Sequence, residues 1–446
     1  MEHLISGPPE RPGVAALAEQ VRSGSVSATE VIQQALARAE SDQWNCIDHV
    51  FRVRAMEQAR LLDKRIAAGD RNLPLAGLPY VAKASFDIAG EPTTAGRVAP
   101  QGLPAATRDA ALVRWLTAAG AIVIATAHMD ELALGFLGRN SPAGPTINPR
   151  DHRQATGGSS SGSAAAVSAG IVPLALGTDT NGSVRVPAAL CGIYAIKPTR
   201  SAWSLKGVSP LAPSLDCAGL FAASLKDLRH GYAALAGSDD RFWSKSATDR
   251  VGLVGGDYDR LTAPATLHRF RTFRKYLPNT LALKLSHIET AFAAAAIITA
   301  YEASKSYEGE MKGNSHLFSE AVAIRLACGL DISPEAYRQA RKWQSRIAAE
   351  LLEILRQVRV LVLPVIPVDQ LLIDQEWVEL DGPHVSASDA AGLYTRPFSL
   401  AGFPVLVVPG RGREPLSCPV QLVGRPGDEP YLFALASQIE TLKSDR

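Results

Sequence analysis

A run of glycine and serine that begins at Gly157, GGSSSGS, passes without a break into AAAVSAGIVPLALGTDT. Runs of this composition usually form flexible linkers between separately folded segments. A linker normally has polar neighbours, whereas this run continues into small and apolar residues that are typical of a closely packed helix and strand. Buried serine hydroxyls need hydrogen-bond partners, because an unpaired one costs roughly 1–3 kcal/mol. The pattern therefore favours a structured, buried turn over a linker.

Glycines beside serines let a backbone turn tightly and direct several N–H groups at one small space. Such a space stabilises negative charge, as an oxyanion hole or an anion-binding nest does. A phosphate-binding loop would contain Gly-Lys-Ser/Thr, and this run has no lysine. A nucleophile elbow would read G-x-S-x-G, and the second serine-containing turn, TNGSVRV, lacks the second glycine. A reactive serine in these turns therefore needs some other base.

Helical and strand patterns alternate along much of the chain. Residues 12–66 have apolar residues at helical spacing, and GLPYVAK then forms a short buried strand that leads to Lys83. An amphipathic helix, an apolar strand at 121–125, the helix SAAAVSAG and the strand IVPLALGTDT follow. This alternation predicts an α/β fold with a central mixed β-sheet flanked by helices on both faces.

The second half of the chain continues this pattern. VGLVGG is predicted to be a strand that enters a peripheral, mainly helical region at 250–357. VRVLVLPVIPV and FPVLVVPG then return the chain to the sheet, and residues 431–442 form a closing helix. A length of 446 residues would allow two or three domains. We expect one large unit, in which the polar stretch at 236–250 is predicted to be a surface connection.

Charge and composition exclude several classes of protein. Forty-six basic and 44 acidic residues leave a net charge of +2, without a block of five like charges, so neither nucleic acid nor a membrane is an expected partner. The most apolar segment, AFAAAAIITAY, is shorter than the roughly 20 residues of a membrane span. The first residues do not resemble a secretory signal, so we expect a cytoplasmic enzyme. Five scattered cysteines and the histidine spacing predict no disulfide framework, metal or cofactor.

The stretch from Gly157 to Thr199, GGSSSGSAAAVSAGIVPLALGTDTNGSVRVPAALCGIYAIKPT, resembles the signature of the amidase signature family of amide hydrolases. GLPYVAK is similar to the catalytic-lysine strand of that family, and TTAG and MDELALGFLGRNSPAGPTINP follow at the usual intervals. LVLPVIP and RPFSLAGFPVLVVP resemble its later sheet segments. The resemblance covers roughly residues 28–438. It implies the amidase-signature fold, as a single catalytic domain over 1–446 with a signature core at 60–235.

Site residues follow from this resemblance by position. Ser183 matches the acylated nucleophile, Lys83 matches the base, and Ser159 matches a bridging serine whose peptide bond is cis. The oxyanion hole would be formed by backbone N–H groups of Thr180, Asn181, Gly182 and Ser183. The resemblance also implies supporting residues: Asp179 and Arg185, which would brace the nucleophile loop, and Ser160, which would add a hydrogen bond.

This assignment agrees with elementary chemistry. Burial disfavours the ammonium form of a lysine, which can then act as a neutral base near pH 7. Lys83 would take a proton from Ser159, which would take one from Ser183 as it attacks the amide carbon. Alone, Lys83 would be better interpreted as an exposed lysine at a strand end, but the two serine motifs favour the base. Asp130 and Glu131 are expected to be surface carboxylates at a helix end.

Within the family, TDTNGSVRVPAALCG, VGLVGGDYDR and YTRPFSLAGFP look most like the biuret and 1-carboxybiuret hydrolase branch. The expected function is hydrolysis of the C–N bond of a small linear, non-peptide amide, with release of ammonia or an amine. One alternative is an ammonia-donating or acyl-transferring subunit related to the A subunit of the tRNA-dependent amidotransferase. Another is an inactive binding subunit. A homodimer and a small partner subunit both stay open.

The chain departs from the family pattern at several positions. Ala84 and Ser85 replace the usual Asp-Asn after the lysine, and Ser399 replaces a frequent asparagine. Gly219-Leu220 and SCPVQL are further departures. Changes beside the expected pocket affect substrate identity more than mechanism, although a change near Lys83 can also alter its pKa. Arg396 is a candidate for binding a substrate carboxylate through a bidentate pair, with a surface role as an equal alternative.

Overall fold

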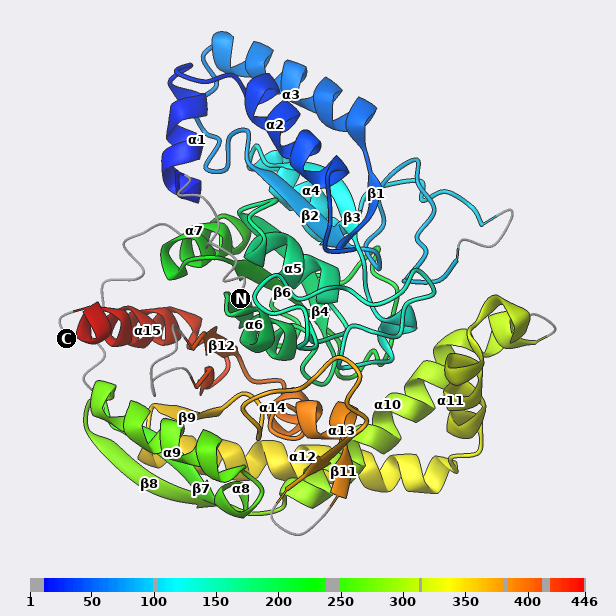
Figure 1. The fold of residues 1–446 in the computed structure, drawn as a ribbon, viewed down its shortest axis with the longest axis vertical. Helices are drawn as coiled ribbons and strands as arrows, with labels where there is room; N and C mark the ends of the chain where they lie inside the picture. The colour runs from blue at the N-terminus through cyan, green and yellow to red at the C-terminus, as the bar shows by residue number, and fades with distance from the viewer. Residues whose placement is uncertain are drawn as a thin grey trace.

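The computed structural model describes residues 12–98, 103–237, 249–312, 315–380, 384–410 and 418–444. Within these ranges, eleven strands form one sheet in the order β1-β3-β2-β4-β6-β5-β12-β13-β9-β7-β8. Figure 1 shows β1, β2 and β3 at one end of the molecule and β7, β8 and β9 at the other. Two short strands, β10 and β11, form a separate ribbon. The strands are β1 (Ile47–Val50), β2 (Pro79–Lys83), β3 (Ile122–Ala127), β4 (Leu174–Asp179), β5 (Tyr194–Lys197), β6 (Cys217–Ala222), β7 (Val251–Gly256), β8 (Thr280–Leu285), β9 (Val360–Pro364), β10 (Trp377–Glu379), β11 (His384–Ser386), β12 (Val405–Val408) and β13 (Val420–Val423).

Strand directions in the large sheet are mixed. β2 runs parallel to both β3 and β4, while β4 pairs antiparallel with β6. At the other end of the sheet, β7 runs parallel to both β8 and β9. The predicted mixed α/β sheet is confirmed.

Helices cover both faces of the sheet. The helices are α1 (Val14–Arg22), α2 (Ala28–Glu40), α3 (Arg52–Ala67), α4 (Ala111–Ala118), α5 (Ser161–Ser168), α6 (Arg185–Cys191), α7 (Leu225–Ala236), α8 (Asp257–Arg260), α9 (Pro264–Phe273), α10 (Ile288–Met311), α11 (Glu320–Leu330), α12 (Pro334–Gln357), α13 (Ala387–Gly392), α14 (Arg396–Ala401) and α15 (Glu429–Ser444), with short 3₁₀ turns η1 (Glu131–Ala133), η3 (Arg274–Tyr276) and η4 (Ser315–Leu317). One core packs α2, α3, α5, α10 and α12 against the sheet, and a second packs α4, α7, α9 and α15 against the other face.

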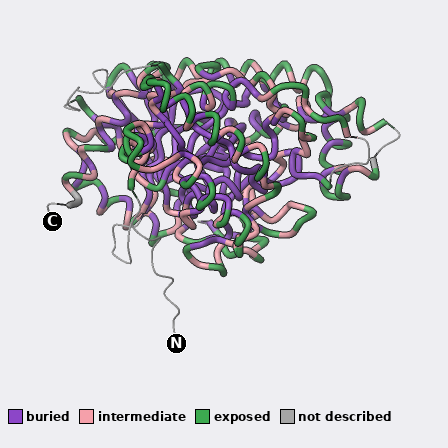
Figure 2. The backbone as a smooth tube through the Cα atoms, turned by 90° about the horizontal axis from the view of Figure 1, so that it is seen from above, coloured by how far each residue is buried: buried purple, intermediate pink, exposed green. Residues whose placement is uncertain are grey.

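The strand sequences explain this two-faced packing, because successive side chains point to opposite faces of a sheet. Along β2, Val81 belongs to the first core and its neighbours Tyr80 and Ala82 belong to the second. Both faces are covered, so the strands are apolar throughout rather than alternating with polar residues. Figure 2 shows the result, with buried residues concentrated in the middle of the molecule and exposed residues along its periphery.

Two strands lie where the sequence predicted mainly helix, and two further strands of the sheet, β6 and β13, were not predicted. β1 interrupts the predicted helical segment 12–66, and β8 lies within the predicted helical region 250–357. β1 is four residues long and half-exposed, and β8 is an edge strand with exposed side chains. Neither has the continuous apolar run by which a buried strand is recognised. In the described ranges, no helix is both long and apolar enough to span a membrane.

The topology brings several chain segments together at one edge of the sheet. β2, β3 and β4 are parallel neighbours, so their carboxyl ends lie at the same edge. β2 ends at Lys83 and β4 ends at Asp179. The loop after β3 leads through η1 to the glycine-serine run, which opens α5. All of the predicted catalytic side chains therefore come from segments that meet at this edge.

Candidate active site

Lys83 is the last residue of β2 and has no exposed surface. Its Nζ donates hydrogen bonds to Ser159 Oγ and to Thr178 Oγ1, each at 2.7 Å. Burial lowers the pKa of Lys83 to about 7, against the opposing effect of nearby carboxylates, of which Asp130 has the largest effect. A lysine with this pKa is substantially neutral at neutral pH, as a general base must be.

Ser159 precedes α5, and the peptide bond between Gly158 and Ser159 is cis, as the resemblance predicted. The loop after β3 holds this bond in place. Gly158 N donates to Phe136 O at 2.8 Å, and Asp130 N donates to Ser159 O at 3.1 Å. Glycine is required at 158 because a Cβ there would overlap the Asp130 carboxylate. Ser159 Oγ is thereby held against Lys83.

Ser183 lies in the turn between β4 and α6 and is 4% exposed. The two serine turns are in direct contact, because Ser160 N donates to Ser183 O at 3.3 Å. Ser160 Oγ donates to Thr178 O at 3.1 Å, which ties the same turn to the end of β4. In the described part of the chain, Ser183 Oγ makes no hydrogen bond, and none joins it to Ser159 Oγ.

The turn before α6 presents unpaired backbone donors. Within the described ranges, the N–H groups of Thr180, Asn181, Gly182 and Ser183 donate to no other group. Gly182 has φ of +141°, a region that favours glycine, and a Cβ there would overlap the hydroxyl of Thr395. Several free N–H groups beside a serine have the arrangement that stabilises a developing oxyanion.

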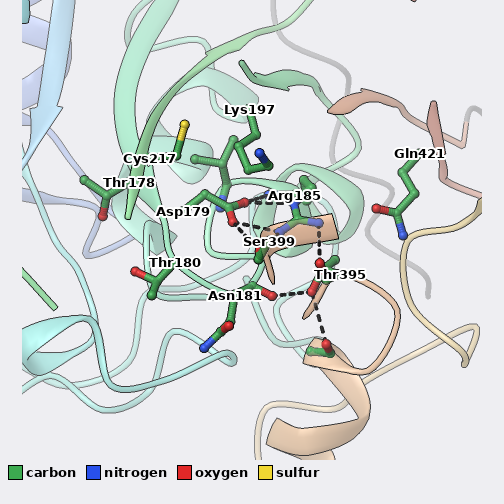
Figure 3. A network of polar contacts seen from close by, with 12 residues as sticks. Thr178, Asp179, Thr180, Asn181, Arg185, Lys197, Cys217, Thr395, Ser399 and Gln421 are labelled. Carbon is green, nitrogen blue, oxygen red and sulfur yellow. Dashed lines mark hydrogen bonds and ion pairs between the residues drawn. The ribbon is translucent and has the colours of Figure 1, made fainter. Parts of the chain in front are cut away.

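Asp179 and Arg185 form a fully buried ion pair at the base of this turn, shown in Figure 3. Arg185 Nε and Nη2 donate to the two carboxylate oxygens at 2.9 and 2.8 Å. Asp179 Oδ2 also accepts from Val184 N at 3.1 Å. Burial alone would raise the pKa of Asp179, but the guanidinium and its hydrogen bonds outweigh burial and lower it. The pair thus links the end of β4 to the start of α6 across Ser183.

Arg185 also connects this turn to α14. Its Nη1 donates to Thr395 O at 2.7 Å, and its Nη2 donates to Ser399 Oγ at 2.6 Å. Thr395 Oγ1 in turn donates to Asn181 O, so both sides of the Ser183 turn are fixed (Figure 3). Ser399, where the family often has asparagine, therefore lies in the network that supports the Ser183 turn and not on a surface.

The expectation that Asp130 and Glu131 are surface carboxylates is wrong, because they are 0% and 1% exposed. Asp130 accepts hydrogen bonds from Gly138 N and Asn140 N, and burial is the main cause of its raised pKa. Backbone donors from later in the same loop thus replace the water that a surface carboxylate would bind. A surface role for Arg396 is likewise excluded, because this residue is 6% exposed.

Arg396 lies at the start of α14, beside the Ser183 turn. Its guanidinium stacks on the ring of Phe292, with Cζ 3.7 Å from the ring centroid, and Nη2 donates to Asp389 Oδ1 at 3.1 Å. Nε and Nη1 are buried without a hydrogen-bond partner in the described ranges. The assignment of Arg396 to a substrate carboxylate stays a prediction.

Sequence reasoning missed three polar residues that support the site. Thr178 accepts a hydrogen bond from Lys83, and Thr299 of α10 accepts one from Asn181 Nδ2 at 2.7 Å. Asp216 accepts from Thr180 Oγ1 at 2.6 Å and from two backbone N–H groups. Thr178 had a local signal because it lies inside the family signature stretch, whereas Thr299 lies in an alanine-rich helix without one. Among the described residues, no His/Cys/Asp/Glu group is suited to a metal ion.

The chain is similar to known proteins along most of its length. A family model described as Amidase matches residues 30–433. AtzE, the 1-carboxybiuret hydrolase subunit of Pseudomonas sp. (strain ADP), is 35% identical over 433 residues, which cover 92% of this chain and 94% of that protein. The glutamyl-tRNA(Gln) amidotransferase of Deinococcus radiodurans has an A subunit that is 33% identical, and the match covers 96% of each chain.

A solved structure is similar along almost the whole chain. It is an inhibitor-bound form of a vestigial protein complex that reveals the evolutionary origins of an s-triazine catabolic enzyme. The TM-score is 0.91 and the identity is 32%, with 97% of this chain and 99% of the other chain covered. The fold is therefore shared over nearly the full length of both proteins.

Proposed function

Because this chain belongs to the amidase family, we propose that it hydrolyses the C–N bond of a small linear amide through a serine acyl-enzyme. The observation that carries the proposal is the buried hydrogen bond between Lys83 Nζ and Ser159 Oγ, combined with the lowered pKa of Lys83. A base of this kind, next to a serine turn with unpaired N–H groups, is suited to acyl transfer.

In the proposed reaction, Ser183 Oγ bonds to the amide carbon while its proton passes to Ser159 and the Ser159 proton passes to Lys83. The negative oxygen of the tetrahedral intermediate accepts hydrogen bonds from the N–H groups at 180–183, which the described chain leaves unpaired. The C–N bond then breaks, and the nitrogen takes a proton back through Ser159 and leaves as ammonia or an amine. Water next adds to the ester, releasing the acid and restoring Ser183.

The Ser159–Ser183 hydrogen bond that this route requires is expected to form with substrate present. Contacts between catalytic groups are often long or poorly aligned without substrate and tighten in the complex. The contact from Ser160 N to Ser183 O already places the two turns side by side. A substrate carbonyl in the oxyanion hole would then orient Ser183 Oγ toward Ser159.

The first experiment measures release of ammonia and amines from purified protein over a panel of biuret, allophanate, malonamide, glutamine, indoleacetamide and aryl amides. Ser183→Ala should abolish turnover, because no acyl-enzyme can form. Ser168→Ala is a matched control, because Ser168 belongs to α5 but donates to Cys191 O, away from the site. Wild-type rates in Ser183→Ala would contradict the proposal.

The best substrate in the panel would show which group of amidases the chain resembles in activity. The similarity to the 1-carboxybiuret hydrolase subunit supports a urea-derived amide. The comparable similarity to the A subunit of the amidotransferase supports a second candidate function, in which the chain supplies ammonia or an acyl group within a larger assembly. Both relatives are named as subunits, which also supports a partner chain.

Product analysis separates these candidates. A hydrolase acting alone yields the free acid together with ammonia or an amine. An acyl-transferring subunit yields a new ester or amide when an acceptor is added, and an ammonia-donating subunit is active only with its partner. An inactive binding subunit yields none of these products with any acceptor or partner.

A further inference from the structure

A cavity of about 260 Å³ lies beside the candidate site. Its polar lining includes Thr178, Thr180 and Ser85. Thr178 Oγ1 is 2.7 Å from Lys83 Nζ, and Thr180 opens the turn that carries Ser183. The cavity therefore lies beside the base, separated from Lys83 by Thr178, and reaches Thr180 at the start of the oxyanion turn.

The rest of the lining is mainly apolar. Met129, Leu132, Val208 and Leu211 contribute side chains, and the ring of Tyr307 is held by a hydrogen bond from its hydroxyl to a backbone oxygen. An apolar cavity of about 150 Å³ is enough to hold benzene. This cavity thus has room for a substituted aromatic ring or a branched aliphatic group, and such a lining gives a urea-like group few hydrogen bonds.

Two polar groups in the lining can be assessed individually. Asp216 is already satisfied by Thr180 Oγ1 and by the N–H groups of Leu211 and Ala212. Ser85 Oγ is buried without a hydrogen-bond partner in the described ranges. Ser85 is one of the departures from the family pattern, and its side chain is smaller than the usual asparagine. The departure enlarges the cavity and leaves one polar group available to a ligand.

The direction of proton transfer identifies which part of a substrate faces this cavity. The proton that leaves Ser183 during attack must return to the amide nitrogen before the C–N bond breaks. The leaving nitrogen therefore faces Ser159, whose hydroxyl is hydrogen-bonded to Lys83. Because the cavity adjoins Lys83 through Thr178, the group attached to the leaving nitrogen lies closest to it.

We propose that this cavity receives the substituent on the leaving nitrogen, and that the substrate class is an amide whose amine carries an aromatic or branched aliphatic group. The inference rests on the proposed function and deepens it. Ser183 Oγ bonds to the acyl carbon, the C–N bond breaks, and the nitrogen takes the serine proton to leave as a neutral amine. Water then completes the reaction by releasing the carboxylic acid.

The test compares acetanilide with acetamide, which share an acyl group and differ only on the nitrogen. Val208→Trp fills the cavity, and Leu205→Phe does so more mildly from a neighbouring position in the lining. Val53→Trp is the matched control, because Val53 is 73% exposed on α3. We expect Val208→Trp to lower kcat/KM for acetanilide roughly tenfold or more, with the acetamide value changed by about twofold at most.

An equal loss for both amides in the folded variants would overturn the inference. A selective loss for phenylacetamide, with acetanilide unaffected, would also overturn it by assigning the cavity to the acyl group. Wild-type protein that cleaves none of these amides and none of the wider panel would contradict the proposed function, and aniline binding then decides the inference separately. Aniline bound by wild type and Val53→Trp but not by Val208→Trp supports it, and aniline bound by none overturns it.

Discussion

Lys83 is unusual because its ammonium group is buried but has three carboxylates near it. Asp130, Asp216 and Asp179 each raise its pKa, yet burial dominates and lowers it to about 7. All three carboxylates have other partners, since Asp130 accepts from two backbone N–H groups, Asp179 pairs with Arg185, and Asp216 accepts from Thr180. Carboxylates that already have partners stabilise the Lys83 ammonium less than the water that burial removes.

The first prediction concerns the pH dependence of catalysis. Only neutral Lys83 can accept a proton, so kcat/KM should rise about tenfold per pH unit below an apparent pKa near 7 and level off above it. The measurement is a pH profile of kcat/KM with the best amide of the panel. A profile that stays flat from pH 5 to 9, with chemistry limiting, would contradict a base with this pKa.

The second prediction uses stability instead of activity. Lys83 has a lower pKa in the folded chain than in the unfolded chain, which lowers the free energy of unfolding. The loss is complete below pH 7 and shrinks as the pH rises toward 10.5. Lys83→Met removes this loss, so the Tm of the variant minus that of wild type should be larger at pH 6 than at pH 10. Lys305→Met, at an exposed position of α10, should show no such trend. Equal differences at both pH values would contradict the lowered pKa.

The sequence predicted which residues gather at the site better than it predicted their surroundings. Lys83, Ser159 and Ser183 lie in motifs with characteristic spacing, and the structure brings their segments together. Asp130 was misplaced because the backbone donors that allow its burial lie eight and ten residues later, at Gly138 and Asn140. Loop closure of this kind leaves no periodic signal in the sequence.

At the scale of elements, α14 is linked to the Ser183 turn although more than 200 residues separate them in the sequence. Arg185 at the start of α6 joins β4 through Asp179 and joins α14 through Thr395 and Ser399. The motif around Ser183 predicted its own turn and helix. The sequence singled out Ser399 as a departure from the family pattern but gave no sign that it contacts Arg185. Contacts between distant elements depend on topology, which local patterns do not report.

The third prediction tests this link. Arg185→Lys keeps the charge but loses the planar fork that contacts Asp179, Thr395 and Ser399 together. Losing two hydrogen bonds made by a charged group should lower the free energy of unfolding by about 3–6 kcal/mol. Because the Ser183 turn loosens, kcat should fall more than KM rises. Urea unfolding and steady-state kinetics measure both effects.

Arg338→Lys is the control for this substitution, since Arg338 forms an exposed pair with Glu335 on α12. Surface pairs contribute little to stability, so the control should behave like wild type. An Arg185→Lys protein with unchanged stability and kcat would show that the buried network does not support the turn.

Burial alone did not decide which strands were predicted, because β6 and β13 are buried along their whole length and were missed, as were the partly exposed β1 and β8. The apolar segments that became β4, β9 and β12 are buried on both faces of the sheet. β1 and β8 owe their strand conformation to pairing with β3 and β7, so partner strands determine them more than their own residues do. Their absence from the sequence-based prediction follows from that dependence.

At the scale of the whole molecule, the region at 250–357 was expected to be peripheral. β7 and β8 extend the central sheet from this region (Figure 1). α10 contacts the Ser183 turn through the hydrogen bond from Asn181 to Thr299. α10 also packs on α14, which carries Ser399. These connections support treating the chain as one folding unit.

The fourth prediction follows from this continuity. If one sheet and one core join the region 250–357 to the site, urea should expose α5 and α10 in a single transition, and activity should be lost in the same range. Hydrogen exchange followed by mass spectrometry, with peptides from both helices, measures this at each urea concentration. Large chains often unfold through intermediates, so coincidence of the two transitions would be informative. Exchange in α10 at clearly lower urea, with α5 still protected, would instead identify 250–357 as a separate unit and contradict the single-domain prediction.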